Sequence, residues 1–373
     1  MGLPKKGNRQ KMTFMTRIFQ KAMTGRTTAN GGGPSLDTML ATFDKELDNF
    51  PTLMQPAPES KPRTPFDSKN VPREKMSMAN MTPKQMLSAL PVMLPLMMQM
   101  RRCSKLYDGT FQPTRAEADA AFMAELESMA RAAGAADIAY VKVPNNAIFR
   151  DKGVPCQYAV IFTVEMDKEN MSSAPSYDAF KEVATGYKNL AVIGNKLARF
   201  MRSNGFAAYP GTALGGLTDY VYLAELAGLG AIGYHGLLIT PDEGARLRIN
   251  TIYTNITNLP IETENENLWV RDFCAMCKKC VRQCPVDAIF DQPRPRGDGG
   301  MQSIDHDSCR DYFNQNFGCA VCLAVCPFSQ AGYDAVHARF KGNPSAPQFR
   351  IPLYGIEAAG PIDDRDAELA EHG

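Results

Sequence analysis

The sequence lacks an excess of charge of either sign, and this limits the partners that the chain can attract. Its 373 residues hold 41 Lys and Arg against 40 Asp and Glu, which gives a formal net charge of +1. No global basic field is available to recruit nucleic acid, so we expect no nucleic-acid partner. The basic residues near the start are followed by no apolar signal region and no twin-arginine motif. We therefore expect a cytoplasmic protein.

Long apolar runs are scarce as well. The most apolar stretch, Met86 to Met98, is shorter than the ~20 residues that a membrane span needs, and Pro91 and Pro95 interrupt it. We expect no transmembrane span, although a peripheral membrane contact stays open. The stretch is predicted to be buried or interfacial. Its methionines could line a pocket, but ordinary core packing is the simpler interpretation.

Cysteine is abundant and unevenly distributed. Eight of the ten cysteines lie between Cys274 and Cys326. The run Cys274-x-x-Cys277-x-x-Cys280-x-x-x-Cys284-Pro285 has the spacing that wraps a [4Fe–4S] cluster. In a paired arrangement three of its cysteines bind one cluster, and the fourth binds the other. The predicted ligands are therefore Cys274, Cys277, Cys280 and Cys326 for one cluster, and Cys284, Cys309, Cys319 and Cys322 for the second.

Zinc and disulfides are the alternatives for these cysteines. Zinc sites use four ligands in two pairs and give no reason for a proline after Cys284 and after Cys326. Disulfides require an oxidising compartment, and the sequence shows no secretory signal. Two clusters are the better interpretation, with Cys309 as the least regular ligand because nine residues separate it from Cys319. Two neighbouring clusters would conduct single electrons. Cys103 and Cys156 are predicted to be plain buried thiols.

The rest of the chain predicts mixed helix and strand. Residues 1 to about 80 are predicted to form an extension that either wraps around its own body or a partner, or is disordered. Periodicity and capping signals predict helices over 36–49, from the Thr114–Glu117 capping box to Gly134, from Ser176 to about Gly205, and over 219–227. Strands are predicted over 138–143, 158–164 and 246–253. Tyr187 lies in the middle of the apolar stripe of the long helix, where its hydroxyl needs a partner.

The glycine run from Gly228 to Gly236 matches the G-x-G-x-x-G motif of dinucleotide-binding proteins, but its structural context differs from that of the motif. The fingerprint requires a strand before it and a helix after it, whereas a predicted helix precedes this run and a strand-like segment follows it. Glycine also permits an approach that a Cβ would block. We therefore expect this backbone to pack close to a large planar cofactor or, more simply, against the protein itself.

Several motifs in order resemble the core of the cobalamin-dependent reductive dehalogenases, a family whose superfamily also contains epoxyqueuosine reductase. The resemblance covers about residues 137 to 340 and is carried by Glu165–Ser176, Tyr187, Pro210, Gly228-Leu-Gly230, Gly236–Pro241, Gly244–Arg248 and Cys326-Pro-Phe328. It implies an α/β (α+β) protein with an irregular extension at 1–110. A nitroreductase-like cobalamin-binding domain at 111–268, a two-cluster ferredoxin-like domain at 269–335 and a tail at 336–373 would follow.

The resemblance also implies an activity and its residues. Electrons would pass through two [4Fe–4S] clusters to cobalamin, which would remove halogen from a small organohalide. Tyr187 matches the family's proton-donating tyrosine, and Arg248 matches its basic partner. A phenol with a pKa of about 10 is a poor acid at neutral pH, and a nearby cation makes proton donation easier. The predicted cobalamin contacts are Gly228, Gly230, Gly233, His235, Gly236, Leu237 and Thr240.

Departures from the family keep other functions open. Ala231 and Tyr234 stand where dehalogenases usually carry an acidic residue and an arginine, and Gly211–Leu214 replaces an expected Gly-Asn pair. The missing fused reductase domain implies a separate electron donor such as a ferredoxin or a flavodoxin. An epoxyqueuosine-type reductase is the alternative that Gly233-Tyr-His235 favours, although the D-x-x-P-x-x-E-R motif of that branch is absent. A plain electron-transfer protein is a third interpretation.

Overall fold

The computed structural model describes residues 36–48 and 50–340. Its main sheet has four strands in the order β1-β2-β6-β3, and every neighbouring pair is antiparallel. The strands are β1 (Ile138–Lys142), β2 (Tyr158–Glu165), β3 (Ala208–Pro210) and β6 (Leu247–Thr254). The predicted strands are therefore confirmed, and the architecture is α+β.

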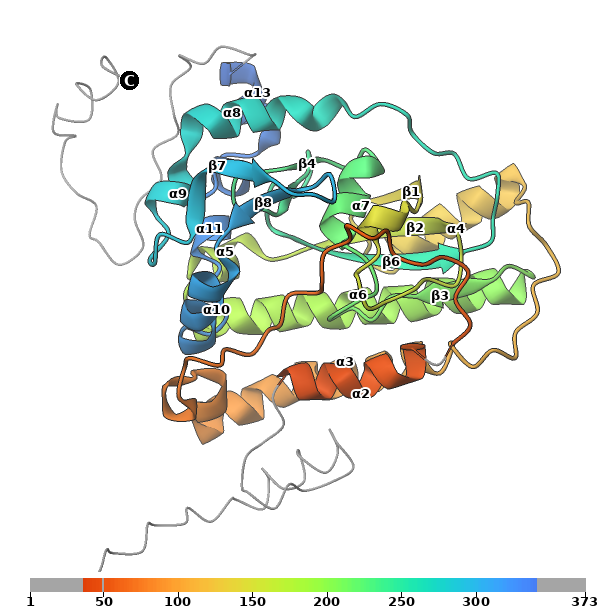
Figure 1. The fold of residues 1–373 in the computed structure, drawn as a ribbon, viewed down its shortest axis with the longest axis horizontal. Helices are drawn as coiled ribbons and strands as arrows, with labels where there is room; N and C mark the ends of the chain where they lie inside the picture. Colours follow the sequence, from red (N-terminus) through yellow and green to blue (C-terminus); the bar gives the residue numbers. More distant parts are fainter. Residues whose placement is uncertain (1–35, 49, 341–373) are drawn as a thin grey trace, which may run out of the picture.

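Helices cover both faces of this sheet, which is why β2 is buried over nearly its whole length. Alternate side chains of a strand point to opposite faces. Val160 and Phe162 join the apolar core on the side of α6 (Tyr177–Ser203), whereas Ala159 and Ile161 join the core on the side of α7 (Tyr220–Leu226). In Figure 1, α6 runs along one face of the sheet, and α3 (Pro83–Ser104) and α2 (Leu36–Asp48) lie beyond it.

Capping explains where the two helices beside the sheet begin. The Ser176 side chain accepts a hydrogen bond from the Ala179 N–H at the start of α6. The Asp219 side chain accepts one from Tyr222 N–H at the start of α7. Each cap satisfies a backbone donor that the first turn leaves unpaired. The long helix from Ser176 and the shorter one from Asp219 are confirmed.

Two helices differ from the prediction. The helix expected from Thr114 begins instead at Ala120, as α4 (Ala120–Ala132) with Asp119 as its cap. The backbone before it is engaged elsewhere: the N–H groups of Thr114 and Arg115 donate to the Gly205 carbonyl. The interruption expected at Pro91 and Pro95 is also wrong, because α3 continues through both prolines. Burial of its apolar side against the body stabilises the helix across them.

The region that precedes α3 wraps the body rather than leaving it. Residues 50–81 contain only the short 3₁₀ turns η1 (Arg73–Lys75) and η2 (Met78–Asn80). They bond across the fold: Met54 pairs with Val154, and Arg150 N–H donates to the Lys61 carbonyl. The wrapped alternative is thus confirmed for this part of the predicted extension. The basic residues near the start and most of the predicted tail lie outside the described residues.

A second lobe holds the cysteine-rich segment. It contains the short hairpin β7–β8 and a series of helices, seen in blue and blue-green in Figure 1. The elements are η4 (Glu266–Leu268), α8 (Trp269–Cys277), α9 (Lys279–Arg282), β7 (Ile289–Pro295), β8 (Met301–Ile304), α10 (His306–Gln315), α11 (Val321–Ala324), α12 (Pro327–Gln330) and α13 (Tyr333–Phe340).

An apolar core continues from the main body into this lobe. It contains Met166 and Ala245 from the body together with Val270, Phe273 and Phe328 from the lobe. The hairpin of β4 (Ala231–Ile232) and β5 (Leu238–Ile239) contributes to the same core. The hairpin that carries the glycine run is consequently packed against the cysteine-rich lobe. The remaining short elements are η3 (Asn145–Ala147) and α5 (Lys168–Ser172).

In the part of the chain that the structure describes, none of the helices combines the length and apolar character that crossing a membrane requires.

Candidate functional site: a cysteine-lined pocket and a tyrosine–arginine pair

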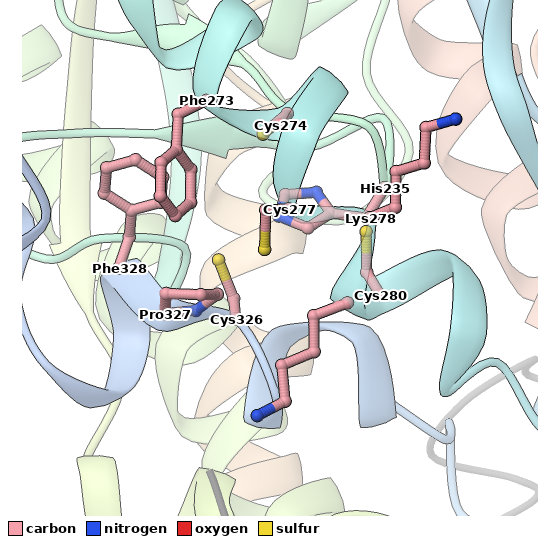
Figure 2. A pocket seen from close by; sticks show the side chains of 10 residues that line it. His235, Phe273, Cys274, Cys277, Lys278, Cys280, Cys326, Pro327 and Phe328 are labelled. Carbon is pink, nitrogen blue, oxygen red and sulfur yellow. The ribbon is translucent and has the colours of Figure 1, made fainter. Parts of the chain in front are cut away.

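The first four predicted cluster ligands line one pocket. Cys274 and Cys277 lie on α8, and a spacing of three residues places them on the same side of that helix. Lys278 adopts a left-handed backbone with φ of 44°, which ends α8 and starts α9 with Cys280. Cys326, which directly precedes Pro327 at the start of α12, lines the same pocket. Figure 2 shows this small, partly open pocket.

Backbone donors surround these thiols. The Tyr234 N–H lies near the Cys274 sulfur and the Lys279 N–H lies near that of Cys277, and each favours the thiolate form. The N–H groups of Phe328 and Ser329 do the same for Cys326. Burial raises the pKa of the Cys326 thiol to about 12 and also raises the pKa values of Cys274, Cys277 and Cys280. Binding iron as thiolates would therefore require all four to release protons.

The other four predicted ligands gather beside the first pocket. The pKa of Cys309 is raised to about 11, first by burial and then by the neighbouring Cys319 and Cys284. The pKa of Cys322 is raised by burial and by four neighbouring cysteines. Three of them, Cys319, Cys309 and Cys284, belong to the same predicted ligand set, and the fourth, Cys280, belongs to the first set. Ala288 N–H donates to the Cys284 sulfur at 3.2 Å. These four cysteines thus lie near one another, and Cys322 also lies near Cys280 of the first group. Their division into two sets of cluster ligands stays a prediction.

The described residues contain no group of three or more His, Cys, Asp or Glu side chains arranged around a single metal ion. A four-iron cluster is much wider than one ion, so its cysteine ligands stand further apart.

Tyr187 and Arg248 meet between α6 and β6. The guanidinium carbon of Arg248 lies 5.2 Å from the centre of the Tyr187 ring, so the cation faces the ring. Gly186 makes room for this contact, because a Cβ at that position would lie 3.1 Å from Arg248 Cγ. The Nε atom of Arg248 is buried without a hydrogen-bond partner. The two residues that sequence predicts to act together are neighbours in space.

The glycines of the run are explained by contacts within the protein. A Cβ on Gly230 would lie 2.1 Å from the Ile239 carbonyl oxygen, so the close approach is to the facing strand of the β4–β5 hairpin. Gly228 and Gly236 have φ of +78° and +76° and form turns. Simple tight packing therefore accounts for the run. Contacts of Gly228, Gly230, Gly233, Gly236, Leu237 and Thr240 with cobalamin stay a prediction.

His235 was predicted as a cobalamin contact, which stays a prediction, and the structure places it at the cysteine pocket. Its side chain is 4% exposed and lines the pocket of the first cysteine group (Figure 2). Burial lowers the pKa of the imidazole to about 4, so it is neutral at pH 7. Its Nδ1 atom accepts a hydrogen bond from Leu237 N–H at 3.2 Å, while its Nε2 atom is buried without a partner.

Two lysines that sequence reasoning missed also line this pocket. Lys278 and Lys279 lie in sequence between Cys277 and Cys280, and Phe273, Pro327 and Phe328 complete the lining of the pocket. Their place inside the Cys277-x-x-Cys280 interval could have identified them, because a cluster with four thiolates is anionic and favours cations nearby. Lys278 also pairs with Asp291 at 2.7 Å.

Comparison with known proteins supports an iron–sulfur protein. A family model described as a 4Fe-4S binding domain matches residues 268–290. A tetrachloroethene reductive dehalogenase from Sulfurospirillum multivorans is 32% identical over 184 residues, which are 47% of this chain and 36% of that protein. A homologous enzyme from Dehalobacter restrictus is 33% identical over 184 residues, 46% of this chain and 33% of that protein. The match thus spans about a third of the length of these relatives.

A second group of relatives matches a shorter region. Epoxyqueuosine reductase from Listeria monocytogenes is 31% identical over 133 residues, which are 32% of this chain and 31% of that protein. Both groups of relatives are oxidoreductases.

Solved structures show the same fold. A reductive dehalogenase whose structure suggests a mechanism for B12-dependent dehalogenation covers 84% of this chain and 51% of its own, with a TM-score of 0.62 and 18% identity. A catabolic reductive dehalogenase in complex with 3-bromo-4-hydroxybenzoic acid covers 85% of this chain and 50% of its own, with a TM-score of 0.58 and 18% identity. The chain is a relative of the reductive dehalogenases and, over a shorter region, of the epoxyqueuosine reductases, and it carries a 4Fe–4S binding domain.

Proposed function

We propose that this chain is a corrinoid iron–sulfur reductase of the reductive dehalogenase type. It would replace a carbon-bound halogen by hydrogen, with electrons delivered through two [4Fe–4S] clusters. The observation that carries this proposal is that one fold unites a paired tyrosine and arginine with two neighbouring cysteine groups. The overall change is a two-electron reduction, in which the substrate R–X takes up two electrons and one proton and yields R–H and a halide ion.

The cysteine groups supply the ligands for the clusters. Cys274, Cys277, Cys280 and Cys326 would hold the first, and Cys284, Cys309, Cys319 and Cys322 would hold the second. The first pocket fits this role because four buried thiols and two lysines line one small space, and backbone N–H groups near three of the sulfurs favour thiolates. The mixed chain order, with Cys326 among the first group and Cys284 among the second, is typical of paired clusters.

Cobalamin is proposed on the family relationship. When bound, it would supply the reduced cobalt centre that accepts the electrons and attacks the carbon–halogen bond. The pocket at the cysteines is lined by four thiols, the ligands that an iron–sulfur cluster requires. The fit of the cysteine pocket therefore supports the clusters and gives no independent support for the corrinoid, whose predicted contacts stay with the β4–β5 hairpin.

Tyr187 would deliver the proton. Its side chain is half-buried on α6, and the Arg248 guanidinium faces its ring. Arginine stays charged when partly buried, so it can stabilise the phenolate that remains after proton transfer. The buried and unpartnered Nε of Arg248 gives this cation a further donor for an anionic group. A separate ferredoxin- or flavodoxin-like donor and a cytoplasmic setting complete the proposal.

Anaerobic reconstitution with iron, sulfide and cobalamin tests this function. We expect about eight iron atoms per chain, four for each of two clusters, one corrinoid and release of halide from members of a panel of organohalides under reducing conditions. Halide measured by ion chromatography should match the dehalogenated product. Protein that holds its clusters but binds no corrinoid would be an electron carrier, and the dehalogenase proposal would fail.

An epoxyqueuosine-type reductase is the second candidate, favoured by the Gly233-Tyr-His235 sequence and by the second group of relatives. The missing D-x-x-P-x-x-E-R motif counts against it. Incubation of the reconstituted protein with an epoxyqueuosine-containing tRNA stem-loop separates the two. Conversion of the modified base without halide release from the panel would replace the leading proposal.

A further inference from the structure

The β4–β5 hairpin presents one buried imidazole to the cysteine pocket. The turn between the two strands is tight: Gly236 N–H donates to the Gly233 carbonyl at 2.9 Å, and Gly233 N–H donates to the Leu237 carbonyl at 3.0 Å. Glycine at 233 leaves space for the ring, since a Cβ there would lie 3.2 Å from His235 Cε1. His235 is therefore held by a short, closed loop and lies among the residues that line the pocket.

The hydrogen bonds of the ring determine which nitrogen carries its proton. His235 Nδ1 accepts a hydrogen bond from Leu237 N–H, so the proton of the neutral imidazole is on Nε2. That Nε2–H is buried and has no partner among the described residues. Buried donors are nearly always satisfied, so an unpaired one calls for a ligand. The pocket that this side chain lines is the space where such a ligand would lie.

The neighbouring backbone already points at the first cysteine group. The Tyr234 N–H lies near the sulfur of Cys274 and favours its thiolate form. The hairpin is tied to the helix that carries Cys274, because Glu225 accepts from Ile232 N–H at 2.8 Å and pairs with Arg271 of α8 at 2.6 Å. Two consecutive residues of the hairpin thus face the cluster site from one side, one through its backbone and the other through its imidazole.

We propose that His235 Nε2–H donates a hydrogen bond to a sulfur of the cluster held by Cys274, Cys277, Cys280 and Cys326. His235 is then a positioning residue that tunes the cluster and is not one of its ligands. The reduced cluster carries more negative charge on its sulfurs than the oxidised one, so a donor favours reduction. Loss of the donor lowers the reduction potential of this cluster, an inference that rests on the proposed cluster assignment.

Selective isotope labelling tests the bond in the unaltered protein. Anaerobically reconstituted full-length chain, labelled with ¹⁵N only in histidine imidazole, is partially reduced and studied by pulsed electron paramagnetic resonance. We expect a ¹⁵N coupling on the reduced cluster signal that His235→Gln changes and that His337→Leu retains. His337 is a matched control because it is an exposed histidine of the same lobe, stacked on Trp269. The absence of the coupling, or its appearance on a cobalt signal instead, overturns the proposal.

Redox titration gives the second measurement. In His235→Leu, which removes the donor, we expect about a tenfold smaller ratio of reduced to oxidised cluster at a fixed potential, equivalent to ~59 mV for a one-electron couple. His235→Gln, whose amide can donate, should recover part of this shift, and His337→Leu should show none. An unchanged potential in His235→Leu with full iron content refutes the role of His235 and leaves the proposed function intact. A wild-type protein that assembles no four-iron cluster refutes the proposed function itself.

Discussion

At the scale of single residues, the proposed proton donor differs from the other tyrosine of its helix by its surroundings. Tyr187 is half-buried and faces a guanidinium, with Arg248 lying over the ring. Tyr177, on the same helix, donates its hydroxyl proton to the Gln85 carbonyl at 2.6 Å and so has a structural partner. The sequence could place Tyr187 on the inward stripe, but only the packed structure shows which charge it meets.

Replacing Tyr187 by Phe removes the proposed proton donor and little else. We expect turnover of an active halide to fall by about 10²–10⁴-fold, the range for loss of a general acid, while iron and corrinoid contents stay unchanged. Tyr177→Phe is the matched control: it loses a hydrogen bond worth about 1 kcal/mol but should keep its turnover. Steady-state halide release measures both. Normal turnover in Tyr187→Phe would exclude this residue from the mechanism.

Replacing Cys280 by Ser should remove one cluster. We expect iron to fall from about eight to about four atoms per chain, because serine is a poor substitute for a thiolate ligand. Electron delivery from an artificial donor should fall with it. Cys103→Ser is the control, since Cys103 lies on α3 and donates to the Pro210 carbonyl at 3.0 Å, a bond that a hydroxyl can also make. Full iron content in Cys280→Ser would show that the ligand assignment is wrong.

At the scale of elements, the contact between α6 and β6 depends on small residues. Glycines at 186 and 194 let the long helix approach the sheet: a Cβ on Gly194 would lie 3.3 Å from Asn250 Nδ2. Helical periodicity predicts that Gly194 faces inward, but it does not predict how close the strand lies. That distance is determined jointly by the side chains of two elements that lie far apart in the sequence.

Gly186→Ala separates helix stability from site geometry. Alanine raises the helix propensity by about 1 kcal/mol over glycine, while its Cβ, 3.1 Å from Arg248 Cγ, forces the arginine side chain to shift. We expect an unchanged or higher melting temperature together with lower turnover. Thr185→Ala is the control, because it also favours the helix and removes only a bond to the Lys181 carbonyl. Equal turnover in both variants would mean that the arginine position does not matter.

At the scale of the whole molecule, the wrapped region joins the two lobes. Ser68 and Asn70 both donate to Asp311 on α10, the helix that also carries Cys309. Asn314 on the same helix donates to the Phe66 carbonyl at 2.9 Å, and Phe317 N–H donates to the Ser77 hydroxyl at 2.7 Å. Residues 66–77 thus hold the cysteine-rich lobe against the N-terminal side of the body.

Asp311→Ala should loosen this connection. Two acceptor contacts are lost at a partly exposed site, which costs about 1 kcal/mol of unfolding free energy, and we expect faster amide hydrogen exchange over residues 66–77. Asp307→Ala is the control on the same helix, where the exposed carboxylate pairs only with the nearby Arg310. Mass-spectrometric hydrogen exchange compares the two. Identical exchange in both variants would show that Asp311 does not hold the wrapped region.

The sequence by itself determined the features that are local or periodic. Cysteine spacing predicted two sets of cluster ligands, and that assignment stays a prediction. Apolar periodicity with capping signals placed α2, α6, α7 and the long strands, because these depend on neighbours within a few residues. It also brought Tyr187 and Arg248 together, but only through resemblance to a family.

Only the tertiary structure decided what depends on contacts between distant segments. The Gly205 carbonyl takes up donors before α4 and delays its start, and packing against α6 carries α3 through two prolines. The facing strand of a hairpin explains Gly230, and the same hairpin brings His235 to the cysteines. The local pattern of apolar residues predicts which side of a helix or strand is buried. The residue that packs against that side depends on how whole elements pack together, and no local pattern contains this information.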